Sequence, residues 1–275
     1  MIVWLASYPK SGNTRVRSFL SSYINSKDSD FILEDLAKIG VFPGNNELNF
    51  LRKKFGKYKF TDMASHWNFF QKEIIKENKI SLLKTHNTLC SINRHDFANS
   101  INSLGLIYII RDPGDVVVSY SHHLNLSFEE TFKIIANKHT VEKTNDLLDK
   151  TLLGSWQNHY NSWKHFPIKK IFLRYEDLTS SAHVSFKKIV FFLNDLCGLT
   201  IDEKKITKTV ESVKFENLKK IEEDRGFIEN PNQKLGKKFF RNGTVGQWGK
   251  VLSPNLIKRI ETEFKNEMIE NNYLN

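Results

Sequence analysis

The sequence predicts an α/β protein in which a central parallel sheet of four to five strands is flanked by helices. Two observations predict it: short apolar runs recur along the chain, and a helical pattern follows each run. Runs of this length, rich in Ile, Leu, Val and aromatics and bounded by polar or turn residues, are typical of strands buried on both faces. The predicted strands span Met1–Ser7, Ser81–Lys84, Gly105–Ile110 and Lys170–Arg174.

Helices are predicted from apolar residues that recur at helical spacing. After the first strand, these residues are Val16, Phe19, Leu20, Tyr23 and Ile24. After the fourth strand, a long apolar stripe runs from Val184 to Leu196. The region Phe128–Phe166 is predicted to be mostly helical, and a last helix is predicted from Pro254.

A long segment, residues 25–80, separates the first two predicted strands and contains no clean strand pattern. We expect one domain over residues 1–275, with this insertion contributing to the pocket of a second substrate, since loops and insertions often carry recognition in α/β enzymes. The alternative is a surface excursion without a role.

The composition restricts the class of protein. Hydrophobic residues make up 40% and charged residues 26% of the 275, which is typical of a folded globular chain. The net charge of +10 favours anionic partners such as nucleotides, nucleic acid, acidic membranes or sulfated glycans. A basic surface that serves solubility alone is an equally open interpretation.

The two cysteines, Cys90 and Cys197, lie far apart and form neither a disulfide framework nor a metal-ligand cluster. We therefore expect a reducing compartment, a cytoplasmic location and no bound metal. No apolar run approaches the roughly 20 residues of a spanning helix, so no membrane span is expected.

A first anion site is predicted where the first strand runs through Tyr8–Arg15 into a helix. A helix N-terminus presents unpaired backbone N–H groups, and Gly12 allows close approach of an anion. Lys10 adds a mobile positive charge, and Ser11 and Thr14 add hydroxyl donors. The opening is P-loop-like, but the lysine precedes the glycine, so it is not a Walker A loop. The alternative is an ordinary capped strand–turn–helix junction.

A second anion site is predicted at the end of the third strand. Arg111 lies at a strand carboxyl end, where ligands bind in open α/β sheets, and its planar fork suits phosphate. Ser119 follows two turns into the next helix. Asp112 or Asp115 favours the N-terminus of that helix, and Asp115 is expected to cap or brace the turn. Two such sites indicate a ligand with two separated phosphates, such as a 3′,5′-bisphosphorylated nucleoside.

These motifs resemble those of the sulfotransferases of the cytosolic type that use 3′-phosphoadenosine-5′-phosphosulfate (PAPS). The loop at Tyr8–Thr14 resembles their 5′-phosphosulfate loop, and Arg111–Ser119 resembles their 3′-phosphate motif. Further matches follow in the family's order and span nearly the whole chain: Leu173–Leu178, Phe215 and Phe240–Trp248.

The resemblance implies PAPS as co-substrate, 3′-phosphoadenosine-5′-phosphate (PAP) as product and no metal. The nucleotide-binding residues that it implies are Lys10, Ser11, Gly12, Asn13, Thr14, Arg15, Arg111, Ser119, Tyr175, Phe215, Phe240, Arg241, Asn242 and Gly243. Arg15 replaces the family's adenine-stacking Trp, Asn242 replaces a Lys, and Gln247 replaces an Asp. The family's short dimer motif is not found after Trp248, so no dimer is carried over and the oligomeric state stays open.

The family also has a Lys-Thr-His segment, which is Lys84–His86 here. A histidine just past a buried strand is well placed to accept a proton at neutral pH. We expect His86 to act as the general base, Lys10 to stabilise the leaving oxygen and Lys84 the sulfuryl oxygens. The acceptor is a hydroxyl or amine on a small molecule, lipid or glycan, and no nucleic-acid partner is expected.

Two rival functions stay open at this point. A P-loop-type kinase that uses ATP accounts for the strand–loop–helix opening, but it lacks the Walker A order. A non-catalytic protein that binds anions or nucleic acid is compatible with the net charge, although no nucleic-acid-binding motif is found.

Overall fold

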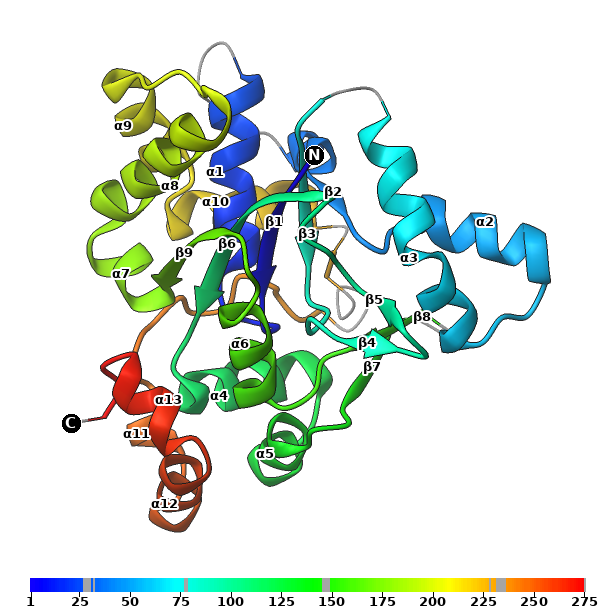
Figure 1. The fold of residues 1–275 in the computed structure, drawn as a ribbon. Helices are drawn as coiled ribbons and strands as arrows, with labels where there is room; N and C mark the ends of the chain where they lie inside the picture. Colours follow the sequence, from blue (N-terminus) through cyan, green and yellow to red (C-terminus); the bar gives the residue numbers. More distant parts are fainter. Residues whose placement is uncertain are drawn as a thin grey trace. The chain divides into compact units, whose positions relative to one another are not determined.

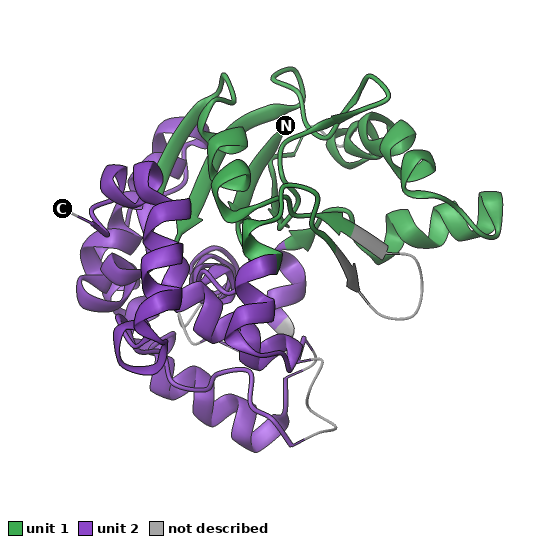
Figure 2. Cartoon of the chain, turned by 90° about the horizontal axis from the view of Figure 1, so that it is seen from below, with its two compact units in different colours: residues 1–8, 40–110, 134–172 green, residues 9–39, 111–133, 173–275 purple. Residues whose placement is uncertain are grey.

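The computed structural model describes residues 1–26, 31, 33–76, 79–144, 149–227, 229–230 and 236–274 (Figure 1). The chain divides into two compact units, coloured separately in Figure 2. Unit 1 comprises Met1–Tyr8, Gly40–Ile110 and Ile134–Phe172, and unit 2 comprises Pro9–Ile39, Arg111–Lys133 and Leu173–Asn275. The single domain over residues 1–275 stays a prediction.

Unit 1 contains the central sheet, whose five strands lie in the order β2-β3-β1-β6-β9 (Figure 1). The last two residues of β9 belong to unit 2. Strand β1 pairs in parallel with β3 and β6, and β2 pairs in parallel with β3. The bounds are β1 Ile2–Ser7, β2 Gly40–Val41, β3 Ser81–Thr85, β6 Ser103–Ile110 and β9 Lys169–Arg174. The predicted α/β class and all four predicted strands are confirmed, with ends that move by at most two residues.

The fifth strand, β2, corrects the expectation that residues 25–80 contain no strand. It has only two residues, one of them glycine, so no apolar run marks it in the sequence. Its register on β3 and a hydrogen bond from Phe42 N to Lys84 O (2.9 Å) hold it at the sheet edge. A strand this short is specified by its neighbour rather than by its own sequence.

A cluster of aromatic rings forms the core of unit 1. The ring of Trp4, in β1, lies 5.6 Å from Phe97 and 5.9 Å from Trp163, between ring centroids. Trp67 packs edge-on against Phe97 at 5.1 Å. These rings bring α3 (Phe60–Ile75) and α6 (Trp156–Lys164) onto the sheet. Helix α2 (Asn45–Phe55) packs on α3.

The region 128–166 is less helical than predicted. Helices α5 (Phe128–Ala136) and α6 confirm the prediction at both ends. Between them, β7 (Val141–Thr144) and β8 (Asp149–Leu152) pair as an antiparallel ribbon. The two strands are short and mostly polar, so they carry no apolar run that a sequence pattern would detect. A second small ribbon pairs β4 (Ser91–Ile92) with β5 (His95–Asp96).

Unit 2 is mainly helical. Phe19 of α1 stacks on Phe186 of α8 at 4.3 Å between ring centroids, which explains the apolar stripes predicted for both helices. Ile24, predicted on the apolar face of α1, is exposed. The elements are α1 Asn13–Asn25, η1 Leu33–Lys38, α4 Pro113–Leu124, α7 Tyr175–Ser180, α8 Ala182–Cys197, α9 Glu203–Ser212, α10 Phe215–Arg225, α11 Trp248–Val251, α12 Pro254–Glu263 and α13 Lys265–Glu270.

Among the helices that the structure describes, none has the length and apolar content that crossing a bilayer requires.

Candidate nucleotide-binding and catalytic site

The loop between β1 and α1 has the backbone shape of an anion cradle. Lys10 and Gly12 both have positive φ, +65° and +97°, on either side of Ser11. Alternation of this kind turns successive N–H groups toward one side and forms a concavity for anions. Within the described residues, no side chain caps the N-terminus of α1. A helix end of this kind attracts a phosphate.

Two residues of this loop show that the cradle suits a polar ligand. Ser11 Oγ is fully buried and has no hydrogen-bond partner among the described residues. A buried hydroxyl without a partner is costly unless a ligand completes it. Gly12 lies against Tyr175, and a Cβ there would come within 2.6 Å of that ring. No larger residue fits this position.

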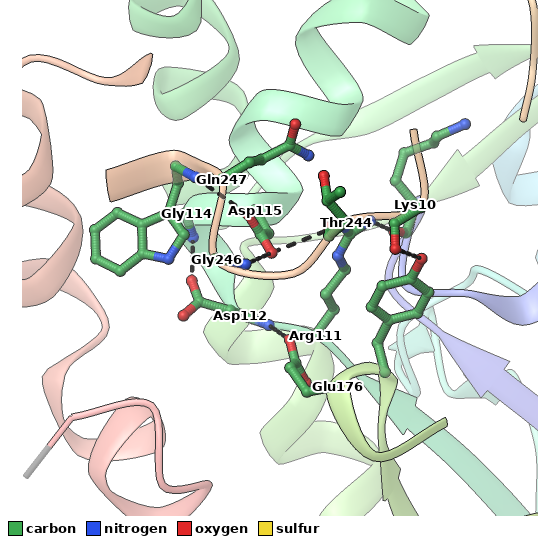
Figure 3. A network of polar contacts seen from close by, with 12 residues as sticks. Lys10, Arg111, Asp112, Gly114, Asp115, Glu176, Thr244, Gly246 and Gln247 are labelled. Atoms are coloured by element: carbon green, nitrogen blue, oxygen red, sulfur yellow. Dashed lines mark hydrogen bonds and ion pairs between the residues drawn. The ribbon is translucent and has the colours of Figure 1, made fainter. Parts of the chain in front are cut away.

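Arg111 joins the first loop to a late loop of unit 2 (Figure 3). Its guanidinium donates to Lys10 O at 3.0 Å and to Thr244 O at 3.1 Å. It also lies over the ring of Tyr175, 4.1 Å from the centroid, and 3.7 Å from a carboxylate oxygen of Asp115. Arg111 is buried, so its direction is fixed by these contacts.

Three carboxylates brace the segment that begins α4 (Figure 3). Asp112 accepts from Gly114 N at 2.7 Å, and Glu176 accepts from Asp112 N at 3.1 Å. Asp115 accepts from Gly246 N at 2.8 Å and therefore holds the late loop. Burial raises the pKa of Asp112 to about 7 and also raises the pKa of Glu176. Asp112 thus caps α4, as expected for one of the two aspartates, whereas Asp115 braces the late loop rather than the turn that it was expected to brace.

The late loop, residues 240–248, packs on the two aromatic residues that the resemblance singles out. Gly243 has φ of +63°, and a Cβ there would lie 2.7 Å from the ring of Phe215. Tyr175 donates its hydroxyl to Gly243 O at 3.3 Å. Phe240 is buried edge-on to Phe215, and Arg241 is exposed. The loop therefore presents the Arg241 charge from a fixed backbone.

A cavity of about 420 Å³ in unit 2 is lined mainly by polar and charged side chains. The predicted residues Lys10, Ser119 and Arg241 line it. The other lining residues are His122, His123, Lys219, Glu223, Asn230, Lys237, Lys238 and Phe239. A second hollow of about 370 Å³ shares Lys219, Glu223 and Arg241 with the first and adds Phe215, Glu216, Lys220 and Asn242.

The cations around the cavity repel one another. Arg241 is exposed overall, but partial desolvation of its guanidinium is the main cause that lowers its pKa, and the positive charge of Arg111 lowers it further. Burial also lowers the pKa of His122, with added repulsion from Arg241 and Lys237. A bound anion would relieve this repulsion, so the electrostatics of the cavity suit a highly charged anionic ligand.

Arg15 points its guanidinium at backbone oxygens of unit 2. It donates to Leu178 O at 2.7 Å and to Val213 O at 3.2 Å. Burial lowers its pKa. The guanidinium is thus held in one orientation, which a planar base could stack on, and its role toward adenine stays a prediction.

Sequence reasoning missed Lys219 and Phe239. Lys219 follows Phe215 by four residues, so both lie on one face of α10, and that helical spacing is the signal that could have found it. The Lys10 ammonium lies 3.9 Å from the centroid of the Phe239 ring, where it makes a cation–π contact. Phe239 directly precedes the late motif in the sequence.

His86 and Lys84 belong to unit 1, whereas all the predicted nucleotide residues belong to unit 2. His86 follows the end of β3 and is partly exposed. Its Nδ1 lies 2.7 Å from Ser7 O at the end of β1. A carbonyl oxygen only accepts, so Nδ1 is the donor, and in the neutral ring Nε2 then carries the lone pair. The backbone thus selects the tautomer in which Nε2 can accept a proton.

Over the described residues, no group of three or more His, Cys, Asp or Glu side chains could hold a metal ion.

Comparison with known proteins gives consistent results. Cytosolic sulfotransferase 16 of Arabidopsis thaliana is 26% identical over 94% of this chain and 73% of its own length. An amine sulfotransferase of Oryctolagus cuniculus is 26% identical over 61% of this chain, which spans about half (55%) of that relative. A solved mouse sulfotransferase, SULT7A1 complexed with PAP, is 19% identical over 97% of this chain and 84% of its own, with a TM-score of 0.62.

The structural likeness shows the fold, and the family is shown by the sequence. A sulfotransferase-domain family matches residues 2–272, which is nearly the whole chain. The match covers the first loop, the Arg111 segment, Lys84–His86 and the late loop in one alignment. The resemblance predicted from those motifs is therefore confirmed, and the chain belongs to the sulfotransferase family of enzymes.

Proposed function

We propose that this protein transfers a sulfuryl group from PAPS to a hydroxyl or amine acceptor, with His86 as the general base. The observation that carries the proposal is the cationic cavity of unit 2, whose lining residue Lys10 belongs to the backbone cradle and accepts a hydrogen bond at its carbonyl oxygen from the buried Arg111. Membership of the sulfotransferase family supports the same reaction.

The residues present fit a 3′,5′-bisphosphorylated nucleoside. The fit rests on Ser11, whose buried hydroxyl has no partner within the described part of the chain, and on the crowded cations. Lys10, Ser11 and the amides at the start of α1 would hold the 5′-phosphosulfate. Arg111, Ser119, Arg241 and Gly243 would hold the 3′-phosphate. The remaining proposed nucleotide-binding residues would contact the adenosine or support the loops around it: Asn13, Thr14, Arg15, Tyr175, Phe215, Phe240 and Asn242.

The proposed transfer is an in-line displacement at sulfur. The acceptor oxygen or nitrogen forms a bond to sulfur while its proton moves to His86 Nε2, and the bond from sulfur to the bridging phosphate oxygen breaks. The leaving electron pair stays on that oxygen of PAP, where Lys10 offsets the charge. Lys84 would stabilise the sulfuryl oxygens. Positioning and electrostatic stabilisation supply the acceleration, as in phosphoryl transfer.

The acceptor class is proposed more broadly. The names of two relatives point to amine and flavonol acceptors for those proteins. For this chain we propose a small molecule, lipid or glycan, with the segment 25–80 contributing to its pocket. We also propose a cytoplasmic location, on the low cysteine content and the names of cytosolic relatives. No nucleic-acid partner and no metal enter the proposal.

The proposed function is tested by incubating the protein with isotopically labelled PAPS and a panel of alcohols, phenols, amines and glycans in the presence of EDTA. We expect the label to appear in at least one acceptor, detected by mass, together with stoichiometric PAP. Transfer of phosphate from ATP in the presence of Mg²⁺, with no use of PAPS, would instead support the kinase alternative.

A further inference from the structure

One face of α6 holds the short segment that carries His86. The residues His159, Ser162 and Trp163 are spaced i, i+3 and i+4 and therefore lie on one side of the helix. His159 Nε2 lies 3.1 Å from His86 O, and Trp163 Nε1 donates to Asn87 O at 3.0 Å. Ser162 Oγ accepts from Leu89 N at 3.0 Å. These three contacts hold the backbone at residues 86, 87 and 89.

The protonation of His159 follows from its partners. Because His86 O only accepts, His159 Nε2 must carry the proton. Its Nδ1 is then the acceptor for the hydroxyl of Tyr108, at 2.8 Å. Both side chains are buried, and burial lowers the pKa of His159 to about 3. Burial also raises the pKa of Tyr108 well above its usual value, so the phenol stays a donor.

A series of hydrogen bonds runs from Tyr108 through His159 and His86 to the end of β1. Tyr108 donates to His159, His159 donates to the carbonyl of His86, and the His86 ring donates to Ser7 O. Each acceptor in this series lies within 3.1 Å of its donor. The peptide group and the ring of His86 are therefore held from two sides, by α6 and by β1.

We propose that His159 is a positioning residue for His86, with Tyr108 fixing the His159 tautomer. This inference rests on the proposed role of His86 as the base. A general base must lie within hydrogen-bond reach of the proton that it takes, and small displacements at that position are costly. Without the donor at His159, the His86 peptide loses its buried partner and the ring can turn away from its working direction.

A purely structural role for His159 predicts different results. Loss of a buried hydrogen bond would lower stability and the amount of folded enzyme, but each folded molecule would work at the normal rate. A positioning role instead lowers kcat per folded molecule and leaves nucleotide binding alone. It also requires that the effect of His159 pass through His86.

The variants His159→Phe, His159→Gln and Tyr108→Phe separate these cases. We expect His159→Phe to lower kcat on the order of 100-fold, with the PAPS KM and PAP affinity changed by less than about twofold. His159→Gln keeps an amide N–H in the place of Nε2 and is expected to recover most of the rate. Tyr108→Phe should lower kcat by about three- to tenfold, as loss of one neutral hydrogen bond does.

Ser103→Ala is a matched control in the same unit. Ser103 Oγ accepts from Trp4 Nε1 at 2.8 Å, so this change also leaves a buried polar group without its partner. Ser103 is level with Ser81 in the sheet register, five residues before His86, which puts it about 16 Å away along the strands. We expect lower stability and an unchanged kcat.

A double-mutant cycle with His86→Ala gives the decisive outcome. If His159 acts through His86, adding His159→Phe to His86→Ala causes no further loss of kcat. A normal kcat in folded His159→Phe, or an undiminished loss in the His86→Ala background, would overturn the positioning role. Should His159→Phe fail to fold, a normal kcat in folded Tyr108→Phe overturns it instead. Full activity of His86→Ala alone would refute the proposed function of His86 as the base, which is a different result from a normal kcat in folded His159→Phe.

Discussion

The two units hold their candidate site residues by opposite means. In unit 1, His86 is held by neutral hydrogen bonds from buried partners, and the pKa of His159 behind it is lowered to about 3. In unit 2, the cavity gathers cations, and the pKa of the buried Asp112 is raised to about 7. The difference matches two tasks: a base needs a fixed direction, whereas a bisphosphate needs charge and many donors. Changes at His86 should therefore affect the rate, and changes at the proposed 3′-phosphate residues of unit 2 should affect nucleotide affinity.

The largest expected effect is that of His86→Ala on turnover. Loss of a general base lowers kcat by roughly 10²- to 10⁴-fold, while PAP affinity stays at the wild-type value. Steady-state kinetics with PAPS and calorimetry with PAP measure the two quantities. The exposed His165, in the same unit, gives the control His165→Ala, which should behave as wild type. A weakened PAP affinity with normal kcat in His86→Ala would contradict the assignment of His86 to the rate rather than to nucleotide binding.

Arg111→Ala should show the reverse pattern. Arg111 is a charged donor that also ties the first loop to the late loop, so we expect PAP binding to weaken by about 2 kcal/mol, or about 30-fold. Arg259→Ala, which removes an exposed pair with Glu129 in the same unit, is the control and should bind PAP normally. Equal PAP affinity for Arg111→Ala and wild type would remove Arg111 from the site.

The variant Asp112→Asn tests whether the buried carboxyl of Asp112 has a raised pKa, by comparing the free energy of unfolding of the variant and the wild type. Because the pKa of Asp112 rises from 3.8 to about 7 on folding, the folded state favours the protonated form. Its contribution to stability is present below about pH 4 and is lost as pH rises through 7. Asn keeps an acceptor for Gly114 N, so Asp112→Asn should be more stable than wild type by about 1 kcal/mol at pH 8 and equal to it near pH 4.

Urea unfolding at the two pH values checks this. The contribution of His159 to stability depends on pH in the opposite direction. Because folding lowers the pKa of His159, its contribution is present above about pH 6.5 and is lost as pH falls toward 3. A variant Asp112→Asn that is less stable than wild type at pH 8 would contradict the assignment.

The smallest expected effect is on the pKa of His122. Burial and the cations Arg241 and Lys237 lower this pKa, so a bound bisphosphate should raise it by offsetting the repulsion. PAP binding then takes up protons, and its affinity should rise a few-fold as pH falls from about 7.5 to 5.5. NMR titration of the His122 ring with and without PAP measures the shift of its pKa. His122→Asn should remove the rise in PAP affinity at low pH. An unchanged or lower pKa in the complex would put the anion elsewhere.

The sequence was informative where one segment carries its own signal. The apolar runs predicted four strands. The loop at Lys10–Gly12 and the motif at Arg111 predicted anion-binding residues, all of which belong to unit 2. Strand β2 has two residues and no such run, so its pairing with β3 decides it. His159 lies 73 residues from His86 in the sequence, and only folding brings its ring to that carbonyl. Supporting residues of this kind depend on tertiary contacts, which periodicity and motif spacing do not encode.

Calorimetric titration of PAP in the presence of EDTA tests the central claim most directly, namely that the cationic cavity of unit 2 binds a 3′,5′-bisphosphorylated nucleoside. We expect saturable binding of one PAP per chain, unaffected by EDTA and much tighter than the binding of ATP. The absence of heat together with an unchanged thermal midpoint at saturating PAP would contradict it, and so would tight binding of ATP that depends on Mg²⁺.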